Sequence, residues 1–224
     1  MNTAELLAGR LDRGRLLQRK AHSDAQVEGL RGGHKLSIGF WKSNDTSGWF
    51  VEARAAKLPL LLSVARHRVG DRAVIARGAM VDLEIGDTEF DRVWRIEGAP
   101  VDTAKRVLDA EVRSLLAPFD AVLLVDERKI SLCPVGDKRV DPSFEELDAA
   151  ATLVATVAAR VALAGRELAP GDPSRAARRE EVKRLKASRE ELWARATWWE
   201  RLVLVVVGLL LLAGACGFVY GTFF

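Results

Sequence analysis

Residues 32–54 read GGHKLSIGFWKSNDTSGWFVEAR and carry the clearest structural pattern in this sequence of 224 residues. Apolar residues alternate with polar or small ones over 35–40, and the alternation returns over 49–54 after a polar segment. Alternation with a period of two is typical of a strand with one buried face. The Gly32-Gly33 pair suits a tight turn between antiparallel strands. These residues therefore predict an antiparallel sheet, one face of which must be covered.

Strand-like segments continue on both sides of this stretch, from about residue 25 to residue 98. Further short apolar runs lie at residues 60–65, 74–75, 81–85 and 90–96. In the last run, Phe90, Trp94 and Ile96 are expected on one face of a strand. Several short strands separated by turns indicate a β-rich domain.

Two helices are expected to cover the sheet. The first begins at Pro100 and keeps helical apolar spacing as far as Leu115, and two strands follow near residues 121–125 and 130–132. The second begins at Asp141-Pro142-Ser143, with Asp141 as its cap, and ends near Leu168. The predicted fold class is α+β: an antiparallel β-rich soluble domain with two packing helices, then a helical stalk and one C-terminal transmembrane helix.

The N-terminal residues 1–22 are predicted to form an amphipathic helix, with Leu7, Leu11 and Leu17 roughly on one face. Arginine and lysine occupy its other positions. The helix could rest on anionic lipid or pack on its own domain, and the second interpretation is favoured. The next part of the chain, 23–168, is the predicted cytoplasmic α+β domain.

Residues 169–201 are predicted to form a Pro/Gly hinge followed by a charged juxtamembrane helix. Asp172-Pro173-Ser174 repeats the helix-start signal of residues 141–143. Leu185, Leu192 and Trp199 then fall seven residues apart, a thin heptad seam that would let two stalks pair.

Residues 202–224 read LVLVVVGLLLLAGACGFVYGTFF, without a charge or a proline. As a helix this segment is about 34 Å long, enough to cross a hydrocarbon core of about 30 Å. Residues 1–20 contain no continuous apolar core of signal-peptide length. We therefore expect a tail-anchored, single-pass membrane protein.

Charge and aromatic residues predict the orientation of this span. Basic residues are frequent before it and absent after it, which places the N-terminal domain in the cytoplasm. Membrane-interface residues are expected at both borders: Trp193, Trp198, Trp199, Arg201 and Tyr220. A small-residue face of Ala213, Gly217 and Gly221 suggests homo-oligomerisation. Abundant arginine and alanine suit a GC-rich bacterium, and hence the bacterial inner membrane.

The composition argues against several classes of function. A net charge of +3 without a sustained basic stripe argues against nucleic-acid binding. The three histidines and the two cysteines, Cys133 and Cys216, form no zinc, esterase or redox motif. We expect no catalytic, cofactor-binding or metal-ligating residues, no cofactor and no enzymatic activity.

Two alternatives remain open from the sequence. An acidic cluster of Asp82, Glu84, Asp87, Glu89 and Asp91 could gather around a cation and support a hydrolase, although carboxylates facing water explain it more simply. A ligand sensor could use an apolar groove beside Trp41, Trp49 and Trp94, although core packing is the better interpretation of these residues.

Residues 86–98, GDTEFDRVWRIEG, contain a short motif of the form GD-x-x-FD-x-x-F/W-x-V/I-x-G. It resembles an element found in a loose group of bacterial membrane-associated proteins of unknown function. The resemblance implies a strand-rich stretch before the motif and a helix with two strands after it. It implies no catalytic residues, and a single C-terminal anchor departs from the group's usual pattern.

The leading hypothesis from the sequence is a tail-anchored binding or scaffold module. Its partners would be the lipid bilayer and a protein at the inner face of the membrane, with no nucleic acid.

Overall fold

The structure is a computed structural model that describes residues 3–18, 25–42, 47–55, 58–68, 71, 82–135, 142–167, 172 and 174–191. The chain divides into two compact units, Met1–Val182 and Lys183–Phe224. The sheet and the helices that cover it belong to the first unit. The predicted membrane span lies outside the described residues.

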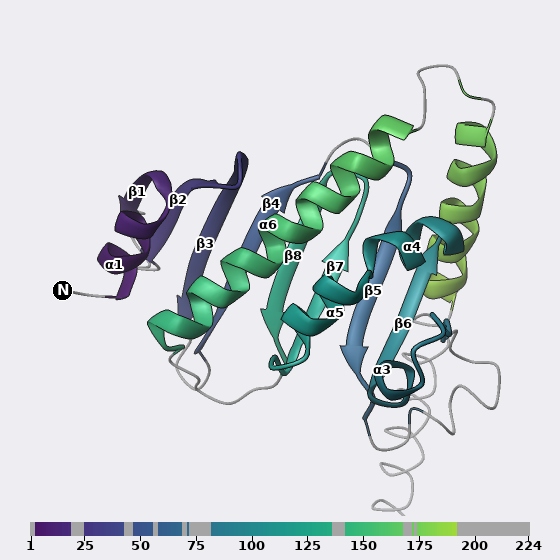
Figure 1. Cartoon of the computed structure of the whole chain (residues 1–224), viewed down its shortest axis with the longest axis horizontal. Helices are drawn as coiled ribbons and strands as arrows, with labels where there is room; N and C mark the ends of the chain where they lie inside the picture. Colours follow the sequence, from purple (N-terminus) through teal and green to yellow (C-terminus); the bar gives the residue numbers. More distant parts are fainter. Residues whose placement is uncertain are drawn as a thin grey trace, which may run out of the picture. The chain divides into compact units, whose positions relative to one another are not determined.

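Eight strands form one sheet in the order β1-β2-β3-β4-β8-β7-β5-β6, and every neighbouring pair is antiparallel (Figure 1). The strands are β1 Asp12–Gln18, β2 Ala25–Arg31, β3 His34–Lys42, β4 Ser47–Arg54, β5 Leu61–Arg66, β6 Trp94–Ala99, β7 Ala121–Val125 and β8 Lys129–Pro134. The predicted α+β fold with an antiparallel sheet is confirmed.

The alternating stretch that predicts the sheet forms its β3 and β4. In this hairpin Ile38 pairs with Val51, and both side chains are completely buried. The turn before β3 runs through Gly32 and Gly33, whose φ angles of 55° and 78° lie in the left-handed region that glycine adopts without a Cβ clash. The predicted glycine turn and antiparallel strands are therefore both present.

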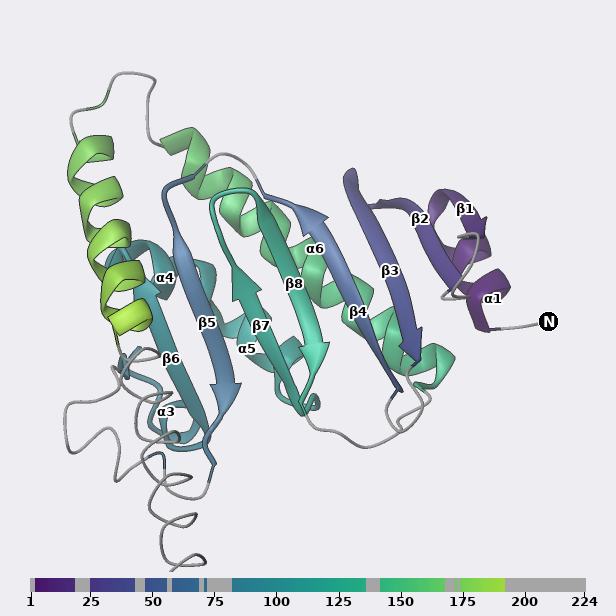
Figure 2. The ribbon, with the colours of Figure 1, turned by 180° about the vertical axis from the view of Figure 1, so that it is seen from behind.

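Helices cover one face of this sheet (Figure 1). They are α1 Thr3–Arg10, α4 Val101–Val107, α5 Ala110–Leu116 and α6 Phe144–Glu167, with the short α3 Thr88–Val93 beside β6. The longest, α6, crosses β2, β3, β4 and β8, while α4 and α5 lie beside it. From behind, the strands β2, β3, β4 and β8 are seen with no described helix in front of them (Figure 2).

By length and composition, α6 also qualifies as a membrane-spanning helix, and it alone does so in the described part of the chain. Of the most apolar stretch of α6, 56% is buried inside the domain. Leu147, Val154 and Val161 are almost completely buried in the same core cluster as the inward side chains of the sheet. In this fold α6 therefore serves as the core helix, as predicted from its apolar stripe.

The start of α6 is capped by Ser143, whose Oγ accepts a hydrogen bond of 3.0 Å from the backbone N–H of Glu146. The predicted cap, Asp141, lies outside the described residues. At the next start signal, Asp172 Oδ1 accepts a hydrogen bond of 2.8 Å from Ser174 N, and a helix follows over residues 174–191.

The predicted N-terminal helix over residues 1–22 is wrong beyond Arg10. α1 ends there, and residues 12–18 form β1, which pairs with β2. The change of direction needs Gly14, because a Cβ there would lie 1.9 Å from the carbonyl oxygen of Ala8. Pairing with β2 satisfies the backbone hydrogen bonds that a glycine-weakened helix would otherwise supply.

The predicted strand over residues 90–96 is also wrong in its first half. Residues 88–93 form α3, and the carboxylate of Asp87 caps it by accepting a hydrogen bond of 3.2 Å from Phe90 N. Phe90 and Trp94 still meet, because residues four apart on a helical turn share a face, and their rings stack 5.5 Å apart. Residues 82–85 are not a strand, although Leu83 N donates to Ile96 O along the edge of β6.

The predicted first covering helix is in fact two short helices. α4 ends at Val107, and Asp109 begins α5 by accepting a hydrogen bond of 2.9 Å from Val112 N. Its side-chain oxygen also pairs with Arg160 on α6. The break escaped prediction because the apolar residues keep a helical spacing across it, although the backbone leaves the helical conformation at Asp109.

The helix over residues 174–191 begins inside the first compact unit, where its first turns contact α4. Arg178 donates to the hydroxyl of Thr103 and pairs with Asp102 at 2.9 Å, at the start of α4. Val182 is completely buried. Of the predicted heptad seam, Leu185 is described, whereas Leu192 and Trp199 lie outside the described residues.

Candidate functional site

The face of the sheet opposite α6 carries many polar and charged side chains. A single row of register partners crosses all eight strands on this face: Arg15, Glu28, Ser37, Glu52, Ser131, Leu124, Ser63 and Glu97. Because side chains alternate between faces, the neighbours of these residues point to the covered core. We call the solvent side of β2, β3, β4 and β8 the open face.

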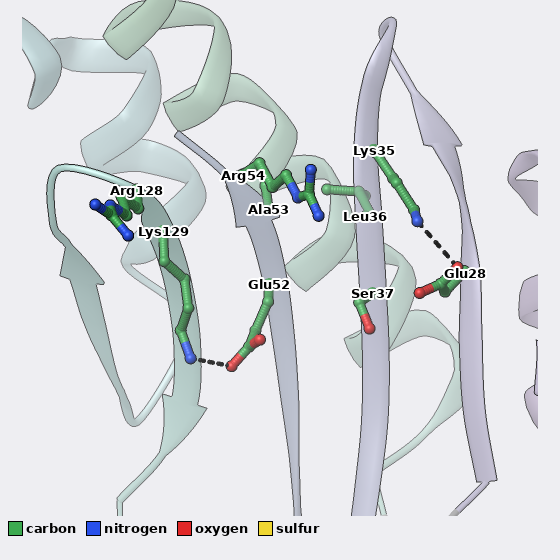
Figure 3. A pocket seen from close by; sticks show the side chains of 9 residues that line it. All are labelled: Glu28, Lys35, Leu36, Ser37, Glu52, Ala53, Arg54, Arg128 and Lys129. Carbon is green, nitrogen blue, oxygen red and sulfur yellow. Dashed lines mark hydrogen bonds and ion pairs between the residues drawn. The ribbon is translucent and has the colours of Figure 1, made fainter. Parts of the chain in front are cut away.

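A shallow pocket of about 330 Å³ lies on the open face, between β2 and β8 (Figure 3). Its lining residues are Glu28, Lys35, Leu36, Ser37, Glu52, Ala53, Arg54, Arg128 and Lys129. Of these residues, Leu36 and Ala53 are buried members of the core, and the others are polar or charged. We call this feature the open-face pocket.

Cationic side chains form a row across three adjacent strands of the pocket. Arg54 on β4 is the register partner of Lys129 on β8. Leu36 pairs with Ala53, so Lys35 lies at the β3 end of the same row. Neighbouring strands are about 4.8 Å apart, which keeps the three cations within reach of one ligand.

Both lysines of this row are already paired. Lys35 Nζ lies 3.1 Å from Glu28 Oε2, and Lys129 Nζ lies 2.5 Å from Glu52 Oε1. Hydrogen bonds from Arg15 and from Lys35 hold the pKa of Glu28 below its ordinary value. Glu28 therefore stays ionised and keeps its lysine engaged at neutral pH.

The two arginines of the pocket differ from the lysines. Among the described residues, neither the Arg54 nor the Arg128 guanidinium has an ion-pair or hydrogen-bond partner, and both side chains are exposed. Arg54 reaches from β4 towards Leu36 and Lys35, and Arg128 lies at the start of β8 beside Lys129 (Figure 3). A guanidinium offers five N–H donors in a planar fork that matches oxyanions. The pocket thus presents unused donors and positive charge.

The predicted acidic cluster does not gather into a metal site. Asp82 Oδ1 accepts from Ile96 N at 2.8 Å, and Asp91 accepts from the backbone N–H groups of Ile85 and Gly86. Asp87 caps α3, while Glu84 and Glu89 are exposed. In the described part of the chain, no three His, Cys, Asp or Glu side chains form a group that could hold a metal ion.

The aromatic groove proposed for a ligand sensor is not formed by Trp49 or Trp94. Trp49 is 1% exposed and meets Phe119 edge to face in the core, and Trp94 is 3% exposed. The core interpretation is therefore correct for these two residues. For Trp41 the structure describes the backbone, in β3, and not the side chain.

The described cysteine and histidines also have structural surroundings. Burial raises the pKa of the Cys133 thiol, which favours the protonated, unreactive form. His67 Nε2 lies 3.2 Å from Asp82 Oδ2, joining the end of β5 to the segment beside β6. His34 begins β3 at the glycine turn, and His22 and Cys216 lie outside the described residues.

The site residues predicted from the sequence all lie outside the described residues. They are Trp193, Trp198, Trp199, Arg201 and Tyr220 at the membrane borders, and Ala213, Gly217 and Gly221 on the pairing face. The pocket residues were missed because strand alternation marks Lys35 and Arg54 only as solvent-facing. Hairpin register could have aligned those two, but nothing local indicates that β8 lies next to β4.

No family model matches the chain, and a search of curated proteins gives no match. Among solved structures, the crystal structure of the mycobacterial trehalose monomycolate transport factor A, TtfA, is similar with a TM-score of 0.41 and 10% sequence identity. The match covers 61% of this chain and 70% of that chain. A likeness at this level transfers no function, and the resemblance of residues 86–98 stays a prediction.

Proposed function

We propose that this chain is a non-catalytic binding module held at a membrane, and that its open face binds an anionic ligand. The observation that carries the proposal is the open-face pocket, where Arg54 and Arg128 present guanidiniums without a partner among the described residues. Paired cations elsewhere in the fold have structural roles, such as Arg31 with Asp148 on α6. Unpaired donors in a concave surface are suited to an oxyanion instead.

The absence of catalysis is part of this proposal. It is supported by the roles of the chemically active side chains, since Asp82, Asp87 and Asp91 bind backbone N–H groups and Cys133 is kept as a thiol. A nucleophile needs a base within hydrogen-bond reach, and among the described residues no histidine or carboxylate forms a hydrogen bond with Cys133.

The membrane assignment rests on residues 202–224, which contain no charged side chain. The basic residues that precede them favour a cytoplasmic sheet domain, and the abundant arginine and alanine suit a bacterial inner membrane. Fractionation of the full chain beside a version ending at Arg201 tests this part. The full chain should stay with the membranes through a high-salt wash, and the shorter version should be released. Release of both would contradict the anchor.

Anion titration tests the binding part. The full chain, purified in a neutral detergent, is titrated calorimetrically with phosphate, sulfate and succinate at low ionic strength. Arg54→Glu and Arg128→Glu should each weaken binding at least about tenfold, because a charge-assisted hydrogen bond is lost and a repulsive charge is added.

Arg166→Glu is the matched control, because Arg166 is an exposed arginine on α6, on the other side of the sheet. This variant should bind anions as the unmodified chain does. Equal losses in all three variants, or no binding by the unmodified chain, would contradict the open face as the binding surface.

A further inference from the structure

We infer that the ligand of the open-face pocket is a phosphomonoester. The inference rests on the proposed function and names the chemical class of its ligand. The pocket contains four cationic side chains, Lys35, Arg54, Arg128 and Lys129, and two carboxylates, which leaves a net charge of +2. A phosphomonoester carries about −1.5 to −2 at neutral pH, whereas a single carboxylate carries −1. The dianion therefore balances the site, whereas a monocarboxylate does not, and a dicarboxylate such as succinate matches the charge without the tetrahedral shape.

Hydrogen-bond donors at the pocket also suit a tetrahedral oxyanion. The Arg54 guanidinium reaches from β4 towards β3 within the pocket (Figure 3). Ser37 Oγ accepts from Gln26 Nε2 at 2.5 Å, so the hydrogen of its hydroxyl is available to donate. Arginine forks and a hydroxyl are donors that bind phosphate oxygens in several directions at once.

The two glutamates restrict the size and charge of the ligand. Glu28 and Glu52 stand on the next row of the open face, so a polyanion extending along the strands would meet their negative charges. A volume of about 330 Å³ is at the small end of ligand pockets. The pocket therefore selects a compact group, either a small phosphorylated molecule or the head group of a phosphomonoester lipid.

Anion selectivity is the first test. The full chain in neutral detergent is titrated with sn-glycerol 3-phosphate, inorganic phosphate and succinate. Glycerol 3-phosphate should bind at least about tenfold more tightly than succinate, and Arg54→Gln should remove that preference while Arg166→Gln retains it. If succinate binds as tightly as the phosphates, the phosphomonoester inference is wrong but the anion-binding proposal stands. If no anion binds, both fail.

The pH dependence of binding is the second test, because a phosphomonoester gains its second negative charge over the measured range and sulfate does not. The second pKa of the phosphomonoester is about 6, so the dianion rises from about 9% at pH 5 to about 91% at pH 7. The affinity for glycerol 3-phosphate should increase about tenfold over this interval. Sulfate stays a dianion and should show no such increase, which separates ionisation of the ligand from any change of charge in the protein. A parallel increase for sulfate would overturn the inference.

A third measurement distinguishes the source of the phosphate. The full chain in phosphatidylcholine nanodiscs is titrated with glycerol 3-phosphate, with and without phosphatidic acid in the disc. A loss of apparent affinity of at least about tenfold with phosphatidic acid, absent in Arg54→Gln, supports a lipid head group as the ligand. Unchanged affinity supports the soluble phosphomonoester. Failure of glycerol 3-phosphate to bind in either disc overturns the inference.

Discussion

The two faces of the sheet come from the same strands but have opposite compositions. In β7, Leu123 is completely buried against the helices, while the adjacent Leu124 is 37% exposed on the other side. In β4, Ala53 belongs to the core and Arg54 to the open-face pocket. The difference shows how one sheet divides two tasks: the covered face supplies the free energy of folding, and the open face is left for binding.

The largest expected effect is a loss of stability when these two leucines are replaced by alanine, one at a time. Leu123→Ala removes a completely buried side chain and should lower the free energy of unfolding by about 2–5 kcal/mol. Leu124→Ala deletes the same atoms from an exposed position and should cost less than about 1 kcal/mol. Denaturant unfolding of the full chain in detergent, followed by tryptophan fluorescence, measures both. Equal losses would mean that the open face is covered as tightly as the other.

The sequence was most informative where both faces obey the strand period. Residues 35–40 and 49–54 predict β3 and β4 because each inward side chain is apolar and each outward one except Phe50 is polar or small. The prediction failed at 88–93, where Phe90 and Trp94 fit a strand face and a helical turn equally well. The capping carboxylate of Asp87 decides between them, and its role is visible only with the backbone of α3 in place.

The candidate site was less predictable than the fold, for a topological reason. Lys35, Arg54 and Lys129 come from three strands, and β8 reaches β4 only after the chain has formed β5, β6 and β7. Single-sequence periodicity assigns each of these residues to a solvent face but does not say which faces become neighbours. A cluster made by non-local pairing leaves no local signal.

A smaller loss of stability is expected when the contact between α5 and α6 is weakened. Asp109 caps α5 through Val112 N and pairs with Arg160 on α6. Asp109→Asn keeps a capping oxygen but removes the charge, and should lower the free energy of unfolding by about 1 kcal/mol at pH 7. Asp126→Asn is the control, because Asp126 accepts backbone hydrogen bonds at the β7–β8 turn, away from the helices.

The same aspartate predicts a pH dependence. Partial burial acts to raise the pKa of Asp109, but the hydrogen bond from Val112 N and the Arg160 guanidinium outweigh it and hold the pKa below its ordinary 3.8. A lowered pKa stabilises the fold above pH 3.8, and that contribution is lost as the pH falls through the lower, folded-state pKa. Melting temperatures of the full chain between pH 2.5 and 6 should show this loss, and Asp109→Asn should reduce it. An identical pH profile in both proteins would contradict the assignment.

Glu52→Gln should change the stability of the fold least of all, while it changes anion binding. Its ion pair with Lys129 lies on the open face, where the two side chains are 29% and 50% exposed. Breaking an exposed pair should alter the free energy of unfolding by no more than about 0.5 kcal/mol. Anion affinity should rise about two- to fivefold, because Lys129 is released and a negative charge leaves the pocket. Glu145→Gln, an exposed glutamate on α6, should change neither quantity. If Glu52→Gln instead weakened anion binding, Glu52 would have to position Lys129 for the ligand. The geometry of the open-face pocket, and not only its net charge, would then determine the affinity.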